Sequence, residues 1–204
     1  MKEGSPVSFD KKTGYRKVLP DGRFLSVEPL STLFIDRGID RHRTSFHEAC
    51  HTVLALYKNI GVKHVTNIAE GDSAGHIAVE KFDPVVAAAS IAMGCDGTGA
   101  DEAMILESGY DLHKAVAEAR RILAGRTDEI LAIATLIEAR RMVSGTETWQ
   151  LSQEVSDIKK NGERYLVRTI NRDGAEEVKE ERVALDDTLT ITLDVYNTEH
   201  SLFT

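Results

Sequence analysis

The sequence predicts an α+β fold, with a mainly helical domain followed by a smaller β-rich module. Between residues 44 and 155, apolar residues recur at helical spacing, whereas from residue 161 they alternate as in strands. The 204 residues, 42% hydrophobic and 28% charged, are enough for one sizeable core and a small appended module. We therefore expect three parts: an N-terminal hairpin and connector (1–43), a helical domain (44–155) and a β-rich extension (156–204). The N-terminal hairpin is expected to join the sheet of the extension.

The N-terminal part holds no strong helix signal. Residues 15–27 are typical of a hairpin, with Pro20-Asp21-Gly22 as the turn, and residues 35–43 form a charged connector. Residues 44–57 are then predicted to be helical, because apolar residues lie at helical spacing and Gly61 offers a stop. Thr44 or Ser45 is expected as the N-cap, with Glu48 completing a capping box.

This helix contains His47-Glu48-Ala-Cys-His51, a His-Glu-x-x-His motif. His47 and His51 would stand one turn apart on the same face, where both imidazoles can bind one metal ion. Glu48 can then act as general base on a metal-activated water. Cys50 is expected to face the core as a small apolar residue, with a role as a soft ligand as the alternative.

Residues 62–68 and 76–80 are rich in β-forming residues and flank a glycine-containing turn, which predicts a second hairpin. Its functional interpretation is an edge strand that binds an extended peptide beside the metal; a purely structural hairpin fits the sequence equally well. The neighbouring histidines, His42, His64 and His76, are interpreted as surface residues rather than ligands.

Pro84 opens a predicted helix that extends to Met93, with Asp83 as its cap. The glycine-rich residues 94–99 interrupt it; without a Gly-Lys-Ser/Thr sequence they indicate a turn rather than a phosphate site. Further helices are predicted at 101–106, 111–123 and 127–143, followed by a short helix or loop after Gly145. Strands are predicted at 164–170, 176–184 and 188–196, the first two joined by a turn at 171–174.

Asp111 stands at the start of one predicted helix, after Ser108-Gly-Tyr110. A carboxylate at this position is commonly an N-cap. The alternative is a third metal ligand held by the helix start, and the sequence pattern alone leaves both roles open.

The net charge and the hydropathy of the chain argue against several classes of function. The net charge of −8 argues against a nucleic-acid-binding surface. No apolar run is long enough to cross a bilayer, and the first residues lack a signal-peptide core. With only two cysteines, one of them inside the motif helix, we expect no structural disulfide and a reducing, cytoplasmic location without a membrane partner.

Over residues 44–153 the sequence resembles the peptidase domain of the FtsH family of zinc proteases. The likeness rests on four ordered motifs: Phe46-His-Glu-Ala-Cys-His51, close to an aromatic-HEAGH helix start; His64-Val-Thr-Asn-Ile68 with Gly75-His76; the segment 93–102; and Ser108-Gly-Tyr-Asp-Leu112. The sequence departs from the family at Cys50, where HEAGH has glycine, and residues after about 155 have no counterpart. It contains no Walker A sequence, ATPase domain or membrane anchor.

The resemblance implies a zinc cofactor held by His47, His51 and Asp111, with Glu48 as the catalytic residue. Should Asp111 prove to be only a cap, Glu102 and His113 are the next candidates. We therefore expect a stand-alone zinc metalloendopeptidase acting on protein or peptide substrates, as a homo-oligomer or with a separate ATPase partner. The alternatives are a catalytically silent or regulatory binding module on this scaffold, and a different His-Glu-x-x-His hydrolase of narrow specificity.

Overall fold

The structure is a computed structural model that describes residues 6–8, 15–18, 22–31, 33–71, 74–183 and 190–192. The chain divides into two compact units: residues 33–156 form one, and residues 1–32 with 157–204 form the other. The fold is α+β, as predicted. The connector at 33–43 groups with the helical unit rather than with the N-terminal strands, since Ile35 and Ile39 pack against the helical core.

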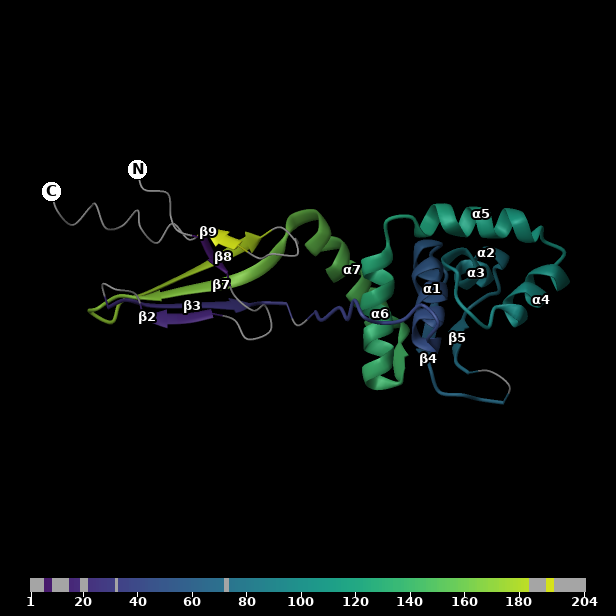
Figure 1. The fold of residues 1–204 in the computed structure, drawn as a ribbon, viewed down its shortest axis with the longest axis horizontal. Coiled ribbons are helices and arrows are strands. Elements are labelled where there is room, and N and C mark those ends of the chain that lie inside the picture. The colour runs from purple at the N-terminus through teal and green to yellow at the C-terminus, as the bar shows by residue number, and fades with distance from the viewer. Residues whose placement is uncertain are drawn as a thin grey trace. The chain divides into compact units, whose positions relative to one another are not determined.

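Helix α1 (Thr44–Tyr57) is the central element of the unit 33–156. It packs against α6 (Thr127–Arg140), and against α2 (Pro84–Ala87) and α3 (Ala89–Met93) on another side (Figure 1). Its side chains are buried around most of the helix, and Val53, Leu54 and Ala55 are fully enclosed. A helix enclosed in this way holds any polar residue on it within the core, where that residue requires a partner.

The predicted capping box at the start of α1 is wrong. The N-cap is Arg43, which makes no side-chain cap hydrogen bond, and the Ser45 hydroxyl donates to Glu138 of α6 at 2.8 Å. The Ser45 hydroxyl, which the local pattern predicts as a cap, thus bonds to a neighbouring helix instead. Glu48 is thereby free of a capping role.

The predicted second hairpin is present as β4 (Val62–Thr66) and β5 (His76–Val79). A third strand, β6 (Met142–Ser144), pairs with the other side of β4, which gives the order β5-β4-β6. The helix predicted to reach residue 143 ends at Arg140 instead. Arg141 has a φ of 66°, and its carbonyl accepts hydrogen bonds from Thr66 and Asn67, so the chain turns there to join the sheet.

Gly145, directly after β6, lies close against the backbone of β4. A Cβ atom on it would lie 1.7 Å from the Val62 carbonyl oxygen. We expect Gly145→Ala to lower the free energy of unfolding by about 1–3 kcal/mol, because β4 must shift to admit the methyl group. Urea unfolding measures this change. Gly99→Ala is the control, since nothing lies within 4 Å of the position that its methyl group would take; equal midpoints for the two variants would contradict the packing.

The helices that follow the hairpin surround one face of α1. Asp83 accepts hydrogen bonds from the Val85 and Val86 amides, which confirms it as the cap of α2. The chain turns at Ala88 into α3, which ends at Gly94 in the left-handed conformation. Helices α4 (Gly99–Glu107) and α5 (Leu112–Leu123) follow, near the predicted positions.

The short helix or loop predicted after Gly145 is in fact the 17-residue helix α7 (Gly145–Asn161). Its first part is anchored within the helical unit, where the Ser152 hydroxyl donates to the buried Glu129 of α6 at 3.1 Å. Glu129 also pairs with Arg126 at 3.0 Å, so a buried polar network holds the helix in register.

The other unit is a sheet in which N-terminal and C-terminal strands pair. Its order is β2 (Tyr15–Val18), β3 (Phe24–Pro29), β7 (Glu163–Ile170) and β8 (Glu176–Val183), all antiparallel. Leu25, Val27 and Tyr165 are its buried residues of largest volume. A two-stranded pair joins β1 (Pro6–Ser8) to β9 (Thr190–Thr192). The rest of the strand predicted at 188–196, and Pro20 and Asp21 of the predicted turn, lie outside the described residues.

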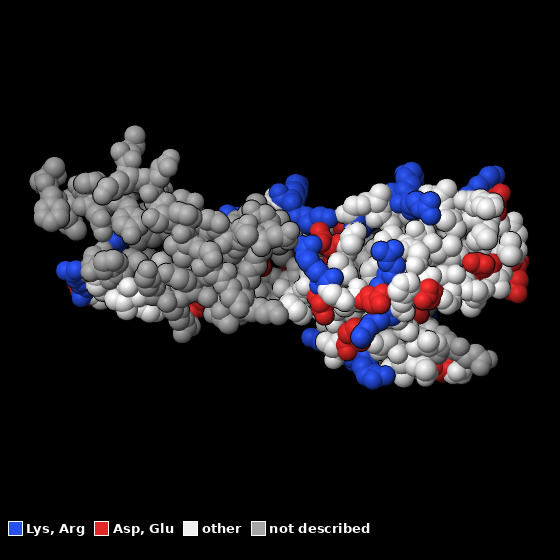
Figure 2. Space-filling view, viewed as in Figure 1, with Lys and Arg blue, Asp and Glu red and all other residues white. Residues whose placement is uncertain are grey.

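Two surface observations bear on the excluded function classes. None of the helices in the described part of the chain combines the length and apolarity that a membrane crossing requires. On the face of the helical unit seen in Figure 2, acidic and basic side chains are interspersed, and no broad patch of one sign covers it.

Candidate metal centre

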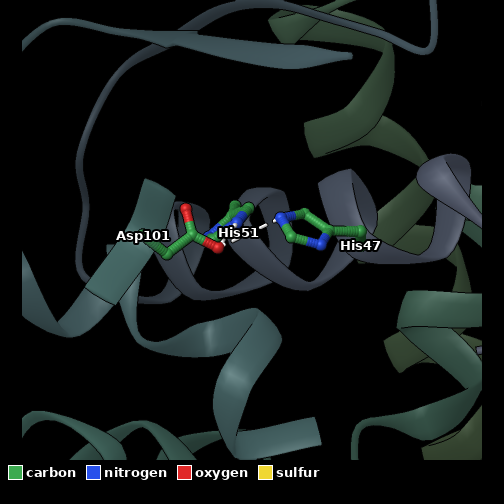
Figure 3. A group of neighbouring side chains, drawn as sticks. All are labelled: His47, His51 and Asp101. Carbon is green, nitrogen blue, oxygen red and sulfur yellow. Dashed lines mark ion pairs between the residues drawn. The ribbon is translucent and has the colours of Figure 1, made fainter. Parts of the chain in front are cut away.

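The structure brings His47 and His51 together with Asp101 of α4. One ligand atom of each residue lies within 4.8 Å of the others (Figure 3). The Nε2 atoms of His47 and His51 are 3.1 and 3.3 Å from Asp101 Oδ2. Two ligands of a tetrahedral zinc, each about 2.0–2.1 Å from the metal, stand about 3.3 Å apart. The two nitrogen–oxygen distances therefore match the spacing of ligands around a small divalent cation.

The second nitrogen of each imidazole fixes the orientation of its ring. His51 Nδ1 lies 2.7 Å from the Val86 carbonyl oxygen, and His47 Nδ1 lies 3.2 Å from the Asp96 carbonyl oxygen. Because a carbonyl oxygen can only accept, both Nδ1 atoms carry a proton and donate it. Neutral rings would then turn two Nε2 lone pairs toward the Asp101 carboxylate. Such a cluster of acceptors requires either further protons or a cation at its centre.

The charges of these three side chains follow from this geometry. Burial acts to lower the pKa of His47, but its hydrogen bond and ion pair with Asp101 outweigh burial and raise that pKa to about 9. The pKa of His51 is also raised, for the same reasons. Burial acts to raise the pKa of Asp101, yet the two imidazoles bring it well below its usual range. Asp101 is thus ionised, and its charge favours the protonated form of both imidazoles.

Ser90 supports the third member of the group. Its hydroxyl is fully buried and donates to Asp101 Oδ2 at 2.5 Å. Ser90 lies on α3, which packs against α1, so the carboxylate is held toward the two histidines from a neighbouring helix. Supporting hydrogen bonds of this kind orient metal ligands in proteins.

Glu48 lies beside the group and is only 6% exposed. Burial raises the pKa of its carboxyl, while the charges of His51, His47 and also His76 act to lower it. A carboxylate whose pKa is moved up toward neutrality is a better proton acceptor at physiological pH than an exposed one. Glu48 thus has the environment of a general base.

The two histidines of the hairpin contact each other. His64 Nε2 and His76 Nε2 are 3.3 Å apart, and their rings meet edge to face. The sequence pattern predicts surface residues here, but both are partly buried, and His76 is close enough to affect the Glu48 carboxyl. His42 is half exposed and pairs with Asp96 at 2.9 Å, so it contacts the residue that supports His47 and not the metal group itself.

Asp111 is not a member of this group. It is the exposed N-cap of α5, where its carboxylate accepts from the Lys114 amide at 2.9 Å, and this hydrogen bond lowers its pKa. Among the described residues, Glu102 and His113 are likewise outside the group. The structure therefore has Asp101 where the resemblance implied Asp111. Asp101 follows a glycine-rich segment that carries no ligand motif. The one indication that its side chain points inward is its position four residues before Ile105, on the same buried side of α4.

Cys50 faces the core, as predicted, and is fully buried. Its thiol neighbours that of Cys95, and both are free cysteines. Burial raises the pKa of the Cys50 thiol, and the interaction with Cys50 lowers the pKa of the Cys95 thiol. Cys50 is thus paired with a second thiol on the side of α1 that carries the motif.

Metal binding at this site is expected to strengthen as pH rises. A metal must displace the proton that His47 keeps up to a pH of about 9, and a further proton where His51 is charged. We expect zinc affinity to increase by about tenfold per pH unit for each displaced proton between pH 6 and 8. Competition with a chromophoric chelator at several pH values measures this dependence. An affinity that stays constant over that range would contradict the assigned protonation.

Comparisons with family models, with curated proteins and with solved structures give no match to this chain.

Proposed function

We propose that this chain is a zinc metallopeptidase that hydrolyses peptide bonds in protein or peptide substrates. The observation that carries the proposal is the convergence of His47, His51 and Asp101 beside a buried Glu48. Two imidazoles and one carboxylate are a ligand set used by catalytic zinc sites, in which a fourth position is left to water or substrate.

Each residue of the site has a chemical task in this proposal. His47, His51 and Asp101 would hold the zinc, and Ser90 orients the carboxylate. A bound zinc supplies Lewis acidity, which polarises the scissile carbonyl and acidifies water. Glu48 accepts the proton of the attacking water and delivers it to the leaving amine. Its burial beside the ligands supports this role, because it stands next to the metal ligand His47 without belonging to the ligand group.

Strand β5 is proposed to align the substrate backbone. It is an edge of the β5-β4-β6 sheet, and it packs against α1. An extended peptide can add to such an edge through main-chain hydrogen bonds, with little demand on sequence. His76 on this strand influences the Glu48 carboxyl, which supports a peptide path past the catalytic residue.

The resemblance to the FtsH peptidase domain supports the same activity class. The motif helix, the hairpin and the following helices occur in the family's order. In this proposal the third ligand is Asp101 of α4, whereas the resemblance implies Asp111. A partner ATPase and a homo-oligomer are both compatible with the proposal. An unfolded substrate removes the need for an unfolding ATPase, so the isolated chain can be assayed by itself.

Hydrolysis of unfolded casein tests the proposal. We expect zinc-loaded protein to release peptides, and we expect 1,10-phenanthroline to abolish the release and added zinc to restore it. The control is the same assay with native, folded substrate protein, which should be cleaved more slowly. Zinc-loaded protein that leaves casein and a set of unrelated unfolded chains intact would contradict a general peptidase and favour the binding module.

A further inference from the structure

Cys50 and Cys95 form a pair of thiols next to the metal group. Cys50 lies between His47 and His51 on α1, and Cys95 follows Gly94 at the end of α3. Both are buried in the same core cluster, and the thiols are close enough to influence each other's pKa. The sequence contains two cysteines in all, so each is the other's one intramolecular partner for a disulfide.

The segment that carries Cys95 also supports two ligands of the metal group. The next residue, Asp96, accepts the hydrogen bond from His47 Nδ1. The Cys95 amide donates to the carbonyl of Ser90, whose hydroxyl holds Asp101. A movement of Cys95 is thereby coupled to the orientation of His47 and of Asp101.

A disulfide between these residues requires such a movement. Bonded sulfur atoms are about 2.05 Å apart, closer than two free thiols can come. Cys50 is fully enclosed on a central helix, whereas Cys95 is 9% exposed and lies where the chain turns out of α3. The Cys95 segment is therefore the part that moves toward α1.

We propose that Cys50 and Cys95 are an oxidation site, and that their disulfide weakens metal binding by His47, His51 and Asp101. This inference rests on the proposed metal site and adds regulation to it. The oxidant is a peroxide, a small neutral molecule, and Cys95 is the less buried of the two cysteines. The reaction with hydrogen peroxide has two steps.

In the first step, the Cys95 sulfur attacks one peroxide oxygen and the O–O bond breaks. The departing oxygen takes the thiol proton and leaves as water, so Cys95 becomes a sulfenic acid. In the second step, the Cys50 sulfur attacks the Cys95 sulfur and the S–O bond breaks, with a second water formed from the hydroxide and the Cys50 proton. The two sulfurs together lose two electrons, and the peroxide is reduced to two waters.

The test uses the full chain, treated with hydrogen peroxide and then alkylated. We expect the monomer to lose about 2 Da and to take up no alkylating agent, because both thiols are in the disulfide. We also expect the zinc dissociation constant, measured with a chromophoric chelator, to rise by at least about tenfold, since the supports of two ligands are displaced. Reduction with dithiothreitol should reverse both changes.

Cys95→Ser is the matched control, since it nearly keeps the shape of the side chain and removes the second sulfur. Its zinc affinity should be insensitive to peroxide. The proposal is overturned if both thiols of the parent chain remain open to alkylation after unfolding, or if the disulfide forms and zinc affinity is unchanged. A chain that forms the disulfide but binds no zinc when reduced would establish the oxidation site while contradicting the proposed function.

Discussion

Glu48→Gln is expected to bind zinc as the parent chain does and to lose peptide hydrolysis by about 10²–10⁴-fold. The amide has nearly the shape of the carboxylate but cannot accept the proton of the attacking water. Because Glu48 is not one of the group that could hold the metal, its replacement leaves the ligand set intact. Metal content and casein hydrolysis, measured on the same preparation, separate the two effects.

Glu107→Gln provides the matched control for this experiment. Glu107 is exposed at the end of α4, so the same chemical change is made away from the site. It should keep both zinc and activity. Hydrolysis by Glu48→Gln at the rate of the parent chain would remove Glu48 from the mechanism.

Asp101→Ala is expected to weaken zinc binding by at least about 100-fold, since it removes one of three ligands and leaves Ser90 without its acceptor. The loss should be larger than for Ser90→Ala, which removes only the support of the carboxylate. Competition with a chelator of known affinity gives the dissociation constants. Circular dichroism establishes that the variant keeps its helices.

Asp111→Ala is the informative comparison, because Asp111 is the ligand that the FtsH resemblance implies. In the structure it caps α5 and lies outside the metal group, so this variant should keep the zinc affinity of the parent chain and be slightly less stable. The reverse result, with Asp111→Ala losing zinc and Asp101→Ala retaining it, would reassign the third ligand to the residue that the resemblance implies.

Local patterns predict much of this fold. The helix at 44–57, the hairpin at 62–80 and the Asp83 cap follow from periodicity, turn residues and capping, and all three are present. The predictions are wrong where distant partners decide the structure. Met142–Ser144 continues a helical pattern but pairs with β4, and Ser45 bonds to Glu138 rather than capping its helix. The partners, β4 and Glu138, are distant in the sequence, so no local pattern indicates them.

The same distinction applies to the site. His47, Glu48 and His51 are predicted by a single motif, because helical geometry alone places them on one side of α1. The third member depends on how a second helix packs against the first. Asp111 has the stronger local signal for a ligand, because it stands at a helix start, but its carboxylate accepts the cap hydrogen bond instead. Asp101 points inward, since it shares the buried side of α4 with Ile105. Cys95 and Ser90 likewise become part of the site only through packing.

Metal content measured by mass spectrometry, on protein purified without a metal-affinity tag, tests the central claim most directly. We expect about one zinc per chain, and its loss in His47→Ala. His113→Ala, a change at an exposed histidine on α5, should leave the zinc in place. A folded chain that carries no metal, and that also fails to bind added zinc at pH 8, would contradict the metal centre and with it the proposed peptidase.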